Sequence, residues 1–364
     1  MIRFIHTSDW HLGAAFSVLP PDLASARRVE QKKAIEQIAD FAISEKVDLF
    51  LAAGDIFNSQ TPSALDIVFV QNIFSKLTNS GIKVFAIPGT HDAYEAGGFW
   101  DKLSVESSAS IIFTGAGLQN YALQDFDLTI FGYPYRKANH HERVLKEFAN
   151  EEINAKNSIL LFHGSWENRG IELTKGYPFT TEEINTLPFS YIALGDYHKF
   201  AQVGAKAAYS GAPLGLDFSA GELGPKSFIL GEIENGKTTV KPIELQTTEF
   251  SNQEIDLTTV SPAQLLADLS AQKNSQQYLR VELSGIPSLE MAAFISNLKN
   301  DISPYFAYAE IKENLAIPNV AEDESTYFGM YCKKLKEMIA KENDEKRQKV
   351  LQKALVLGIG LFNK

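Results

Sequence analysis

After its first methionine the chain reads Ile2-Arg3-Phe4-Ile5-His6-Thr7-Ser8-Asp9-Trp10-His11-Leu12-Gly13. An apolar run of strand length ends here in a carboxylate and an imidazole two residues apart, those of Asp9 and His11. In an extended backbone, residues i and i+2 point to the same side of the strand. We therefore expect both side chains to aim at one point beyond the end of a strand, with His6 packed or hydrogen-bonded nearby.

The same pattern recurs at four later places in the chain. Apolar runs at 49–53, 84–88, 159–162 and 191–194 are each followed closely by an aspartate or a histidine. Those residues are Asp55, His91 with Asp92, His163, and Asp196 with His198. In open α/β sheets, ligands bind at the carboxyl ends of the strands. Five strand ends therefore predict one shared site at that edge.

Helical periodicity separates the first three runs. Residues 24–45 and 62–79 predict helices, and the resulting β-α-β-α-β order predicts parallel strands joined by crossover helices. We expect the buried face of the second helix to hold Leu65, Val68, Phe69, Ile73 and Leu77.

The later part of this region changes in texture. Residues 111–133 predict short antiparallel strands, 138–154 a polar helix, and 207–245 further strands with a hairpin turn at 234–237. Together these segments predict an α/β fold with two stacked mixed β-sheets flanked by helices.

The sequence predicts three domains. Residues 1–248 form the main domain, 249–318 a small α+β capping domain, and 319–364 a helical tail. The tail carries two apolar stripes at helical spacing: Phe328, Tyr331, Leu335 and Met338, then Val350, Leu351, Ala354 and Leu355. Packing on their own domain and docking on a partner helix are equally compatible with these stripes.

Composition narrows the class of protein. The 364 residues are 45% hydrophobic and 22% charged, as in ordinary globular proteins. The single cysteine, Cys332, excludes a disulfide framework and a cysteine-based metal site. We find neither a run of about 20 apolar residues nor a signal-peptide pattern, so we expect a cytoplasmic protein without a membrane role.

A net charge of −11 argues against a broad basic surface for nucleic acid. Bound divalent cations can nevertheless supply positive charge locally, so a nucleic-acid substrate stays compatible. We expect the basic pairs Arg27-Arg28 and Lys32-Lys33 to be solvated, with phosphate contact as the alternative. His140 and His141, at the start of the polar helix, are also expected in solvent.

The residue types at the strand ends point to metal chemistry. Carboxylate and imidazole ligands without thiolates suit manganese, iron or zinc. A carboxylate shared by two cations makes a two-metal site, with ions about 3.5–4 Å apart. Asp55, at the end of a central strand, is the natural bridge.

These motifs resemble a known family. Asp9-x-His11, Gly54-Asp55-x-x-Asn58, Gly89-x-His91-Asp92, His163 and Gly195-x-x-His198 are similar to the motifs of the calcineurin-like metallophosphoesterases. The opening segment, and later Tyr209-Ser210-Gly211-Ala212-Pro213 through Phe218, resemble more narrowly the SbcD-type DNA repair nucleases. The resemblance covers about residues 1–245 and implies the metallophosphoesterase fold.

The resemblance also implies a role for each motif residue. Asp9, His11 and His198 would hold a first metal ion, and Asp55 would bridge to a second ion held by His163. His91 would protonate the leaving oxygen or steady the phosphate, with Asp92 orienting its ring, and Asn58 would contact substrate. Two divalent ions are expected, with manganese first and iron, zinc or magnesium as alternatives.

The sequence departs from the family pattern twice, both times at the second metal. Thr90 stands where the family has asparagine, and Asp196 stands where it has histidine. An aspartate can still ligate a hard cation through oxygen. A threonine hydroxyl is a poorer ligand than an amide carbonyl, so occupancy of the second position is in question.

The resemblance implies a metal-dependent phosphodiesterase acting on DNA, as an exonuclease or endonuclease. It further implies an SMC-like coiled-coil ATPase partner of the SbcC type, docked on the C-terminal helices, and it is compatible with a homodimer. Two alternatives stay open. One is a phosphoesterase for a cyclic nucleotide or phosphomonoester, and the other is a scaffold subunit with an impaired second metal site.

Overall fold

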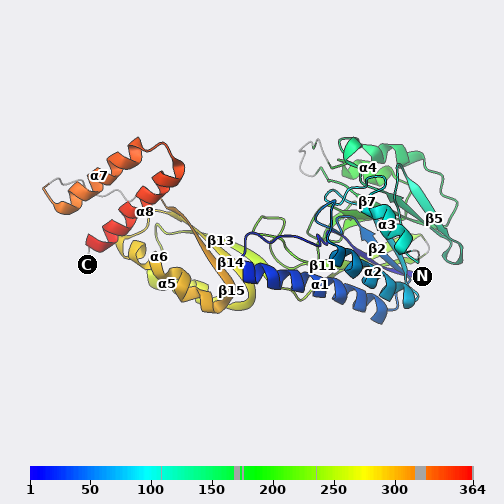
Figure 1. Cartoon of the computed structure of the whole chain (residues 1–364), viewed down its shortest axis with the longest axis horizontal. Coiled ribbons are helices and arrows are strands. Elements are labelled where there is room, and N and C mark those ends of the chain that lie inside the picture. Colours follow the sequence, from blue (N-terminus) through cyan, green and yellow to red (C-terminus); the bar gives the residue numbers. More distant parts are fainter. Residues whose placement is uncertain (108, 168–172, 174–175, 235, 316–324, 363–364) are drawn as a thin grey trace. The chain divides into compact units, whose positions relative to one another are not determined.

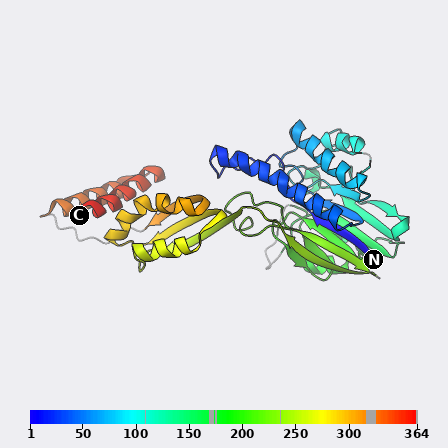
Figure 2. The same cartoon turned by 90° about the horizontal axis from the view of Figure 1, so that it is seen from below.

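The computed structural model of the protein (Figures 1 and 2) describes residues 1–107, 109–167, 173, 176–234, 236–315 and 325–362. The chain divides into two compact units, Met1–Thr247 and Thr248–Lys364. In the described part of the chain, no helix combines the length and apolar character needed to cross a membrane.

The described residues of the first unit form two six-stranded sheets, which confirms the expected pair of mixed sheets. The first sheet has the order β12 (Lys237–Glu244), β11 (Ser227–Glu234), β1 (Ile2–Thr7), β2 (Leu49–Ala53), β3 (Lys83–Ile87), β4 (Ile111–Ile112). The second has the order β5 (Gln119–Leu123), β6 (Leu128–Tyr133), β7 (Asn157–His163), β8 (Tyr191–Gly195), β10 (Ala207–Tyr209), β9 (Ala201–Val203). Strands β1 to β4 run parallel in the first sheet, as do β6, β7, β8 and β10 in the second.

The two sheets pack face to face across a buried apolar layer. Leu51 and Phe85 of the first sheet share this layer with Ile159 and Leu161 of the second. Because side chains alternate along a strand, Phe4 of β1 lies in this layer while Ile5 faces the helices on the other side. The aspartates and histidines predicted at strand ends lie at the carboxyl ends of parallel strands in both sheets.

Helices cover the outer face of each sheet. The first sheet packs against α1 (Pro21–Ser44), α2 (Ala64–Asn79) and α3 (Phe99–Glu106) through one apolar cluster. The second packs against α4 (Thr181–Thr186) and the 3-10 helix at Val144–Asn150. This arrangement is the predicted α/β layering.

Three local expectations are wrong. On α2, Leu65 and Val68 are 78% and 49% exposed. The buried stripe is instead Val70, Ile73, Phe74 and Leu77, whose i, i+3, i+4, i+7 spacing faces the sheet and turns the other two away from it. On α1, Arg27 is fully buried, because its guanidinium donates to Gly215 O at 2.9 Å and pairs with Glu30 at 2.7 Å.

The third wrong expectation is the polar helix at 138–154. The segment forms only short 3-10 helices, at Lys137–Asn139 and Val144–Asn150. Tertiary contacts override helix propensity here, since Arg143 is held by the carboxylates of Glu167 and Glu183, both at 2.9 Å. His141 is exposed as expected, whereas His140 is half-buried.

The second unit contains an all-parallel sheet of order β13 (Glu249–Asp256), β14 (Asn274–Gly285), β15 (Phe306–Leu315). Helices α5 (Pro262–Ala271) and α6 (Leu289–Ile302) connect these strands and cover them. Strand β13 begins at the domain boundary predicted between residues 248 and 249. Among the described residues it pairs only with β14, and because Phe250 and Ile255 are its apolar residues, it shows no alternating strand periodicity.

The tail forms two helices in this second unit, α7 (Tyr327–Lys341) and α8 (Glu345–Phe362). Their shared cluster is Phe328, Tyr331, Cys332, Leu335, Ile339, Leu351 and Leu355. Met338 and Val350, expected in the stripes, are 44% and 68% exposed.

The pairing of β1 with β11 gives a stability prediction. A Cβ at Gly231 would lie 2.1 Å from Cζ of the fully buried Phe4, so Gly231→Ala forces one of the two strands to shift. We expect a loss of about 1–3 kcal/mol in the free energy of unfolding, measured by urea denaturation. Gly221→Ala is the control, because a Cβ there meets no atom within 4 Å. Equal losses in the two variants would contradict the packing described.

Candidate metal centre

The strand-end residues of both sheets gather at one place. Three overlapping groups each bring their ligand atoms within 4.8 Å of one another: Asp9, His11 and His198; His11, Asp55 and His91; Asp9, Asp55 and His163. The loops that follow β1, β2 and β3 therefore meet the loops that follow β7 and β8. The sequence-predicted residues converge although they come from two different sheets.

The backbone that carries Asp9 and His11 is left-handed, with φ of 55° and 50°, so the expected extended conformation is wrong. Hydrogen bonds to the loop after β2 hold it, from Asp9 N to Gly54 O at 3.0 Å and from His11 N to Asp55 O at 2.9 Å. Left-handed non-glycine residues cost about 1–3 kcal/mol each and cluster at functional sites. Both side chains still reach the same point, by a different backbone route.

Two imidazoles face each other at the first position. Nε2 of His11 lies 3.1 Å from Nε2 of His198, and Nε2 of His198 lies 3.9 Å from Oδ1 of Asp9. The Nδ1 atoms are occupied elsewhere, His11 by Asn58 Oδ1 at 3.2 Å and His198 by the carboxylate of Glu222. Two convergent ring nitrogens beside a carboxylate are a donor set that fits a divalent cation.

His163 defines the second position. Its Nδ1 lies 2.9 Å from Ala53 O, which fixes the ring, while its fully buried Nε2 has no hydrogen-bond partner among the described residues. That Nε2 is 3.6 Å from Oδ2 of Asp55 and 3.8 Å from Oδ1 of Asp196. A buried polar atom without a partner is costly, and a cation bound there would complete it. The residues present therefore fit a metal ion.

Asp55 lies between the two positions. Its Oδ2 is 3.7 Å from Nε2 of His11 and 3.6 Å from Nε2 of His163. The backbone N of His91 donates to its Oδ1 at 2.7 Å, and the hydroxyl of Thr90 donates to its Oδ2 at 2.9 Å. Thr90 thus contacts the candidate metal centre through a hydrogen bond to the carboxylate of Asp55.

Asp196, which follows β8 of the second sheet, contacts residues of both positions. Its backbone N donates to the carboxylate of Asp9 at 3.1 Å. One of its own oxygens accepts from Ser165 Oγ at 2.7 Å, and the other faces His163.

His91 and Asp92 have separate roles. His91 is exposed, and its ring meets the ring of His11 edge-on with centroids 4.7 Å apart. The expectation that Asp92 orients the His91 ring is wrong, because its buried carboxylate accepts from Gly89 N at 2.6 Å and Phe57 N at 2.9 Å. A buried carboxylate takes such backbone donors to satisfy its lone pairs, so Asp92 fixes the loops after β2 and β3.

Charge at the centre is strongly perturbed. Burial lowers the pKa of His11 to about 3. Burial alone would also lower the pKa values of His163 and His198. Asp55 and Asp9 outweigh it at His163, and the Glu222 hydrogen bond outweighs it at His198, raising both pKa values to about 9. The clustered carboxylates thus create a site that favours positive charge.

Sequence reasoning missed three supporting residues. Gln31 on α1 donates its amide to Trp10 O at 2.8 Å and to His11 O at 3.1 Å. Glu222 and Lys226 lie buried between β10 and β11. Neither Glu222 nor Lys226 follows directly on the carboxyl end of a strand or belongs to a quoted motif, so the sequence alone carries no signal for them. His6 hydrogen-bonds to Tyr191 Oη at 3.0 Å and Leu194 O at 3.1 Å, beside the centre as expected.

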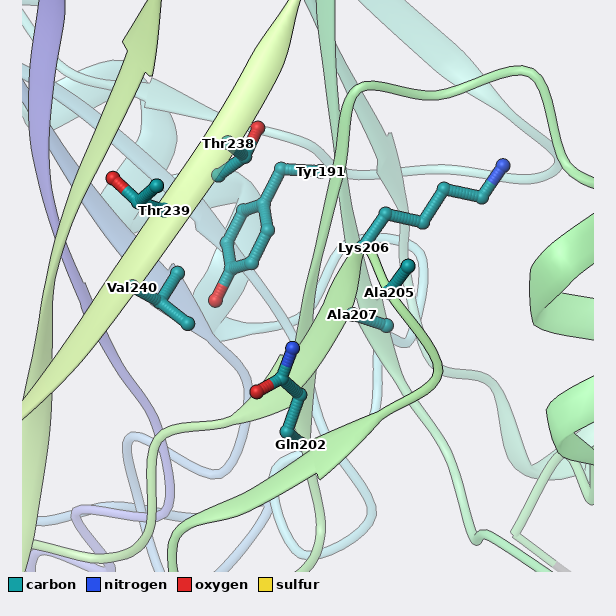
Figure 3. A pocket seen from close by; sticks show the side chains of 8 residues that line it. All are labelled: Tyr191, Gln202, Ala205, Lys206, Ala207, Thr238, Thr239 and Val240. Atoms are coloured by element: carbon teal, nitrogen blue, oxygen red, sulfur yellow. The ribbon is translucent and has the colours of Figure 1, made fainter.

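A separate pocket lies at the opposite ends of β8 and β10, beside β12 (Figure 3). Tyr191, Gln202, Lys206 and Thr238 are among its lining residues. The lining includes none of the candidate ligands, so this pocket is not the metal centre.

The chain is similar to a known family and to several known proteins. The model of the calcineurin-like phosphoesterase family matches residues 2–200. The "Uncharacterized metallophosphoesterase YhaO" of Bacillus subtilis is 26% identical over 65% of this chain and 58% of its own length. The "DNA double-strand break repair protein Mre11" of Thermoplasma acidophilum is 25% identical over 90% of this chain and 89% of its own length. A subunit of the SbcCD nuclease of Bacillus subtilis is 24% identical over 60% of this chain and 63% of its own length.

The pKa values predict proton release on metal binding. His163 and His198 carry protons below their pKa of about 9 and must lose them to ligate a cation. Near pH 7 we expect about two protons released, with affinity for Mn²⁺ rising up to about tenfold per pH unit for each proton. Calorimetry in two buffers of different ionisation enthalpy measures the number. An affinity independent of pH between about 6 and 8 would contradict the charge states described.

Proposed function

The chain belongs to the calcineurin-like phosphoesterase family, and we propose that within it the protein is a two-metal phosphodiesterase that cleaves DNA. Membership in the family supports a metal-dependent phosphoesterase. The observation that carries the proposal is the Asp55 carboxylate, 3.7 Å from His11 and 3.6 Å from His163, with Nε2 of His163 unpartnered beside it among the described residues. Such a shared carboxylate is what a pair of cations requires.

In the proposed site, Asp9, His11 and His198 would hold the first cation, His163 and Asp196 would hold the second, and Asp55 would contact both. Two bound divalent ions supply stabilisation of phosphate charge and activation of the attacking water. Thr90 keeps Asp55 in place through its hydroxyl. Asp196 adds an oxygen where the family has a nitrogen, and this favours manganese or magnesium over zinc.

His91 is the proposed proton donor to the leaving oxygen. It is the exposed histidine of the cluster, so substrate can reach its ring. Its backbone N is tied to Asp55 at 2.7 Å, which holds it at the rim of the centre. Asn58 steadies the ring of His11 at 3.2 Å and extends the same rim.

DNA is the proposed substrate because of the relatives and the charge. The Mre11 relative is named for repair of DNA double-strand breaks, and the SbcCD relative is named as part of a nuclease. The protein has 34 Lys and Arg against 45 Asp and Glu, so its net charge of −11 does not attract a polyanion, and bound metal ions would supply the local attraction at the site. Small phosphoesters are the rival substrates.

The outer face of α7 is the proposed docking surface for a coiled-coil ATPase partner. Tyr327, Met330 and Met338 are 83%, 46% and 44% exposed and lie on one side of the helix, away from the cluster shared with α8. Exposed apolar residues at helical spacing suit an amphipathic partner helix. This stripe differs from the one expected from the sequence, whose other members face α8.

The central test compares two substrates with added Mn²⁺, linear DNA and bis-nitrophenyl phosphate. We expect both to be hydrolysed and DNA cleavage to vanish on chelation. Hydrolysis of the small ester alone would favour the small-substrate alternative. Binding of one ion without hydrolysis of either substrate would favour a scaffold subunit.

His91→Ala separates the chemistry from metal binding in the same assays. Loss of a general acid lowers turnover by about 10²–10⁴-fold, while Mn²⁺ affinity should stay as in the parent. His141→Ala, also an exposed histidine but outside the candidate groups, should change neither. Loss of metal in proportion to activity would show that His91 is a ligand instead.

The docking surface is tested by single charges on α7. Met330→Glu and Met338→Glu should each weaken binding of the purified coiled-coil ATPase at least about tenfold, since each buries a charge in an apolar contact. Ala340→Glu adds the same charge at an exposed position on another side of the helix and should leave binding unchanged. Equal binding by all three variants would remove α7 from the interface.

A further inference from the structure

The segment between β10 and β11 buries an acid and a base that the proposed catalytic set does not include. The exposed fractions of Glu222 and Lys226 are 7% and 2%. Their Oε2 and Nζ atoms are 3.5 Å apart. Burying such a pair costs desolvation energy that its mutual attraction seldom returns in full. The other contacts of Glu222 and Lys226 therefore indicate why this pair is buried.

Glu222 contacts His198 directly. One carboxylate oxygen accepts from Nδ1 of His198. The other accepts from Leu216 N at 3.0 Å and from Lys226, so both oxygens are engaged. An ionised carboxylate accepts hydrogen bonds and cannot donate them, so this contact keeps the proton of His198 on Nδ1. The lone pair for a cation is then on Nε2, which faces His11 at 3.1 Å.

Lys226 fixes the same histidine from its backbone side. Its Nζ donates to His198 O at 3.2 Å and to Gly221 O at 3.1 Å, besides the contact with Glu222. One ammonium group thus ties the carboxylate, the loop that carries it and the main chain of the histidine. The side chain and the backbone of His198 are both held by groups remote in sequence.

We propose that Glu222 is a positioning residue that sets the tautomer and ring orientation of His198 for a divalent cation, and that Lys226 holds Glu222 for this purpose. A carboxylate behind a metal-binding histidine raises the basicity of the ligating nitrogen and fixes its aim. The inference rests on the metal centre proposed above but does not depend on DNA as the substrate.

Glu183 provides a matched control. Like Glu222, it is a largely buried carboxylate that accepts from a backbone N, that of Thr180 at 2.8 Å, and pairs with a cation, Arg143 at 2.9 Å. Its side chain is 14% exposed, against 9% for Glu222. It contacts none of the candidate ligands in the hydrogen bonds and ion pairs described.

The experiment is calorimetric titration of the metal-free protein with Mn²⁺, with thermal unfolding measured in parallel. We expect Glu222→Ala to weaken the tighter Mn²⁺ site by about 10–100-fold. Glu222→Gln should weaken it less, because one amide oxygen can still accept from His198. Glu183→Ala should lower thermal stability and leave Mn²⁺ affinity unchanged. Equal Mn²⁺ affinity in Glu222→Ala and Glu183→Ala would overturn the proposal.

A second measurement uses the parent protein. It tests the proposal even if the Glu222 variants fail to fold. Long-range ¹H–¹⁵N NMR of the Zn²⁺-loaded protein reports which nitrogen of His198 carries hydrogen. A protonated Nδ1 with Zn²⁺ on Nε2 is expected, and Zn²⁺ on Nδ1 would overturn the proposal. A parent that binds neither ion would refute the metal centre itself, and the two failures are thus distinguishable.

Discussion

The convergence of three carboxylates on one buried point governs the first unit of this protein. Asp9 and Asp55 are 1% and 2% exposed. The backbone N of Asp196 donates to the carboxylate of Asp9, and its side chain faces His163, which also lies beside Asp55. Like charges at such short range cannot all stay ionised in a buried site without cations between them. The raised pKa values of His163 and His198 express the same demand for positive charge. Metal ions would meet that demand and displace the protons.

Bringing the two sheets close enough for this convergence requires glycine at two strand ends. A Cβ at Gly89, after β3 of the first sheet, would lie 2.8 Å from Cε1 of His163 in the second sheet, and one at Gly195 in the second sheet would lie 2.0 Å from Ala53 O in the first. Both glycines directly precede or begin the motif segments, so they serve the approach of the loops. Within the first sheet, the loops after β1 and β2 have left-handed backbone at Asp9, His11 and Asp55, and they are hydrogen-bonded to each other from Asp9 N to Gly54 O and from His11 N to Asp55 O.

The altered second position is built coherently around oxygen. Thr90 donates to the shared carboxylate, and Asp196 faces His163 while accepting from Ser165. If Asp196 holds the second cation as proposed, this position has an additional negative charge where the family pattern has a nitrogen ligand. In the proposed site, stronger Coulomb attraction and a harder ligand set would act together and favour a hard divalent ion over zinc.

The sequence by itself determined the layers of the fold and which residues could meet. Strand and helix periodicities are local, so the sequence alone predicts the order β-α-β-α-β and the polar residues at five strand ends. The departure from the family pattern at Asp196 is also visible in the sequence, because it is a single substitution within a motif. Other features arise only when distant segments touch. The burial of Arg27 depends on Gly215, Asp92 is taken by Gly89 and Phe57, and Glu222 reaches His198 from between two later strands. Segment 138–154 does not form the predicted helix because Arg143 pairs with residues distant in sequence, Glu167 and Glu183. Tertiary structure decided these points because a side chain's partners, and hence its charge and aim, are set by contacts that no local pattern encodes.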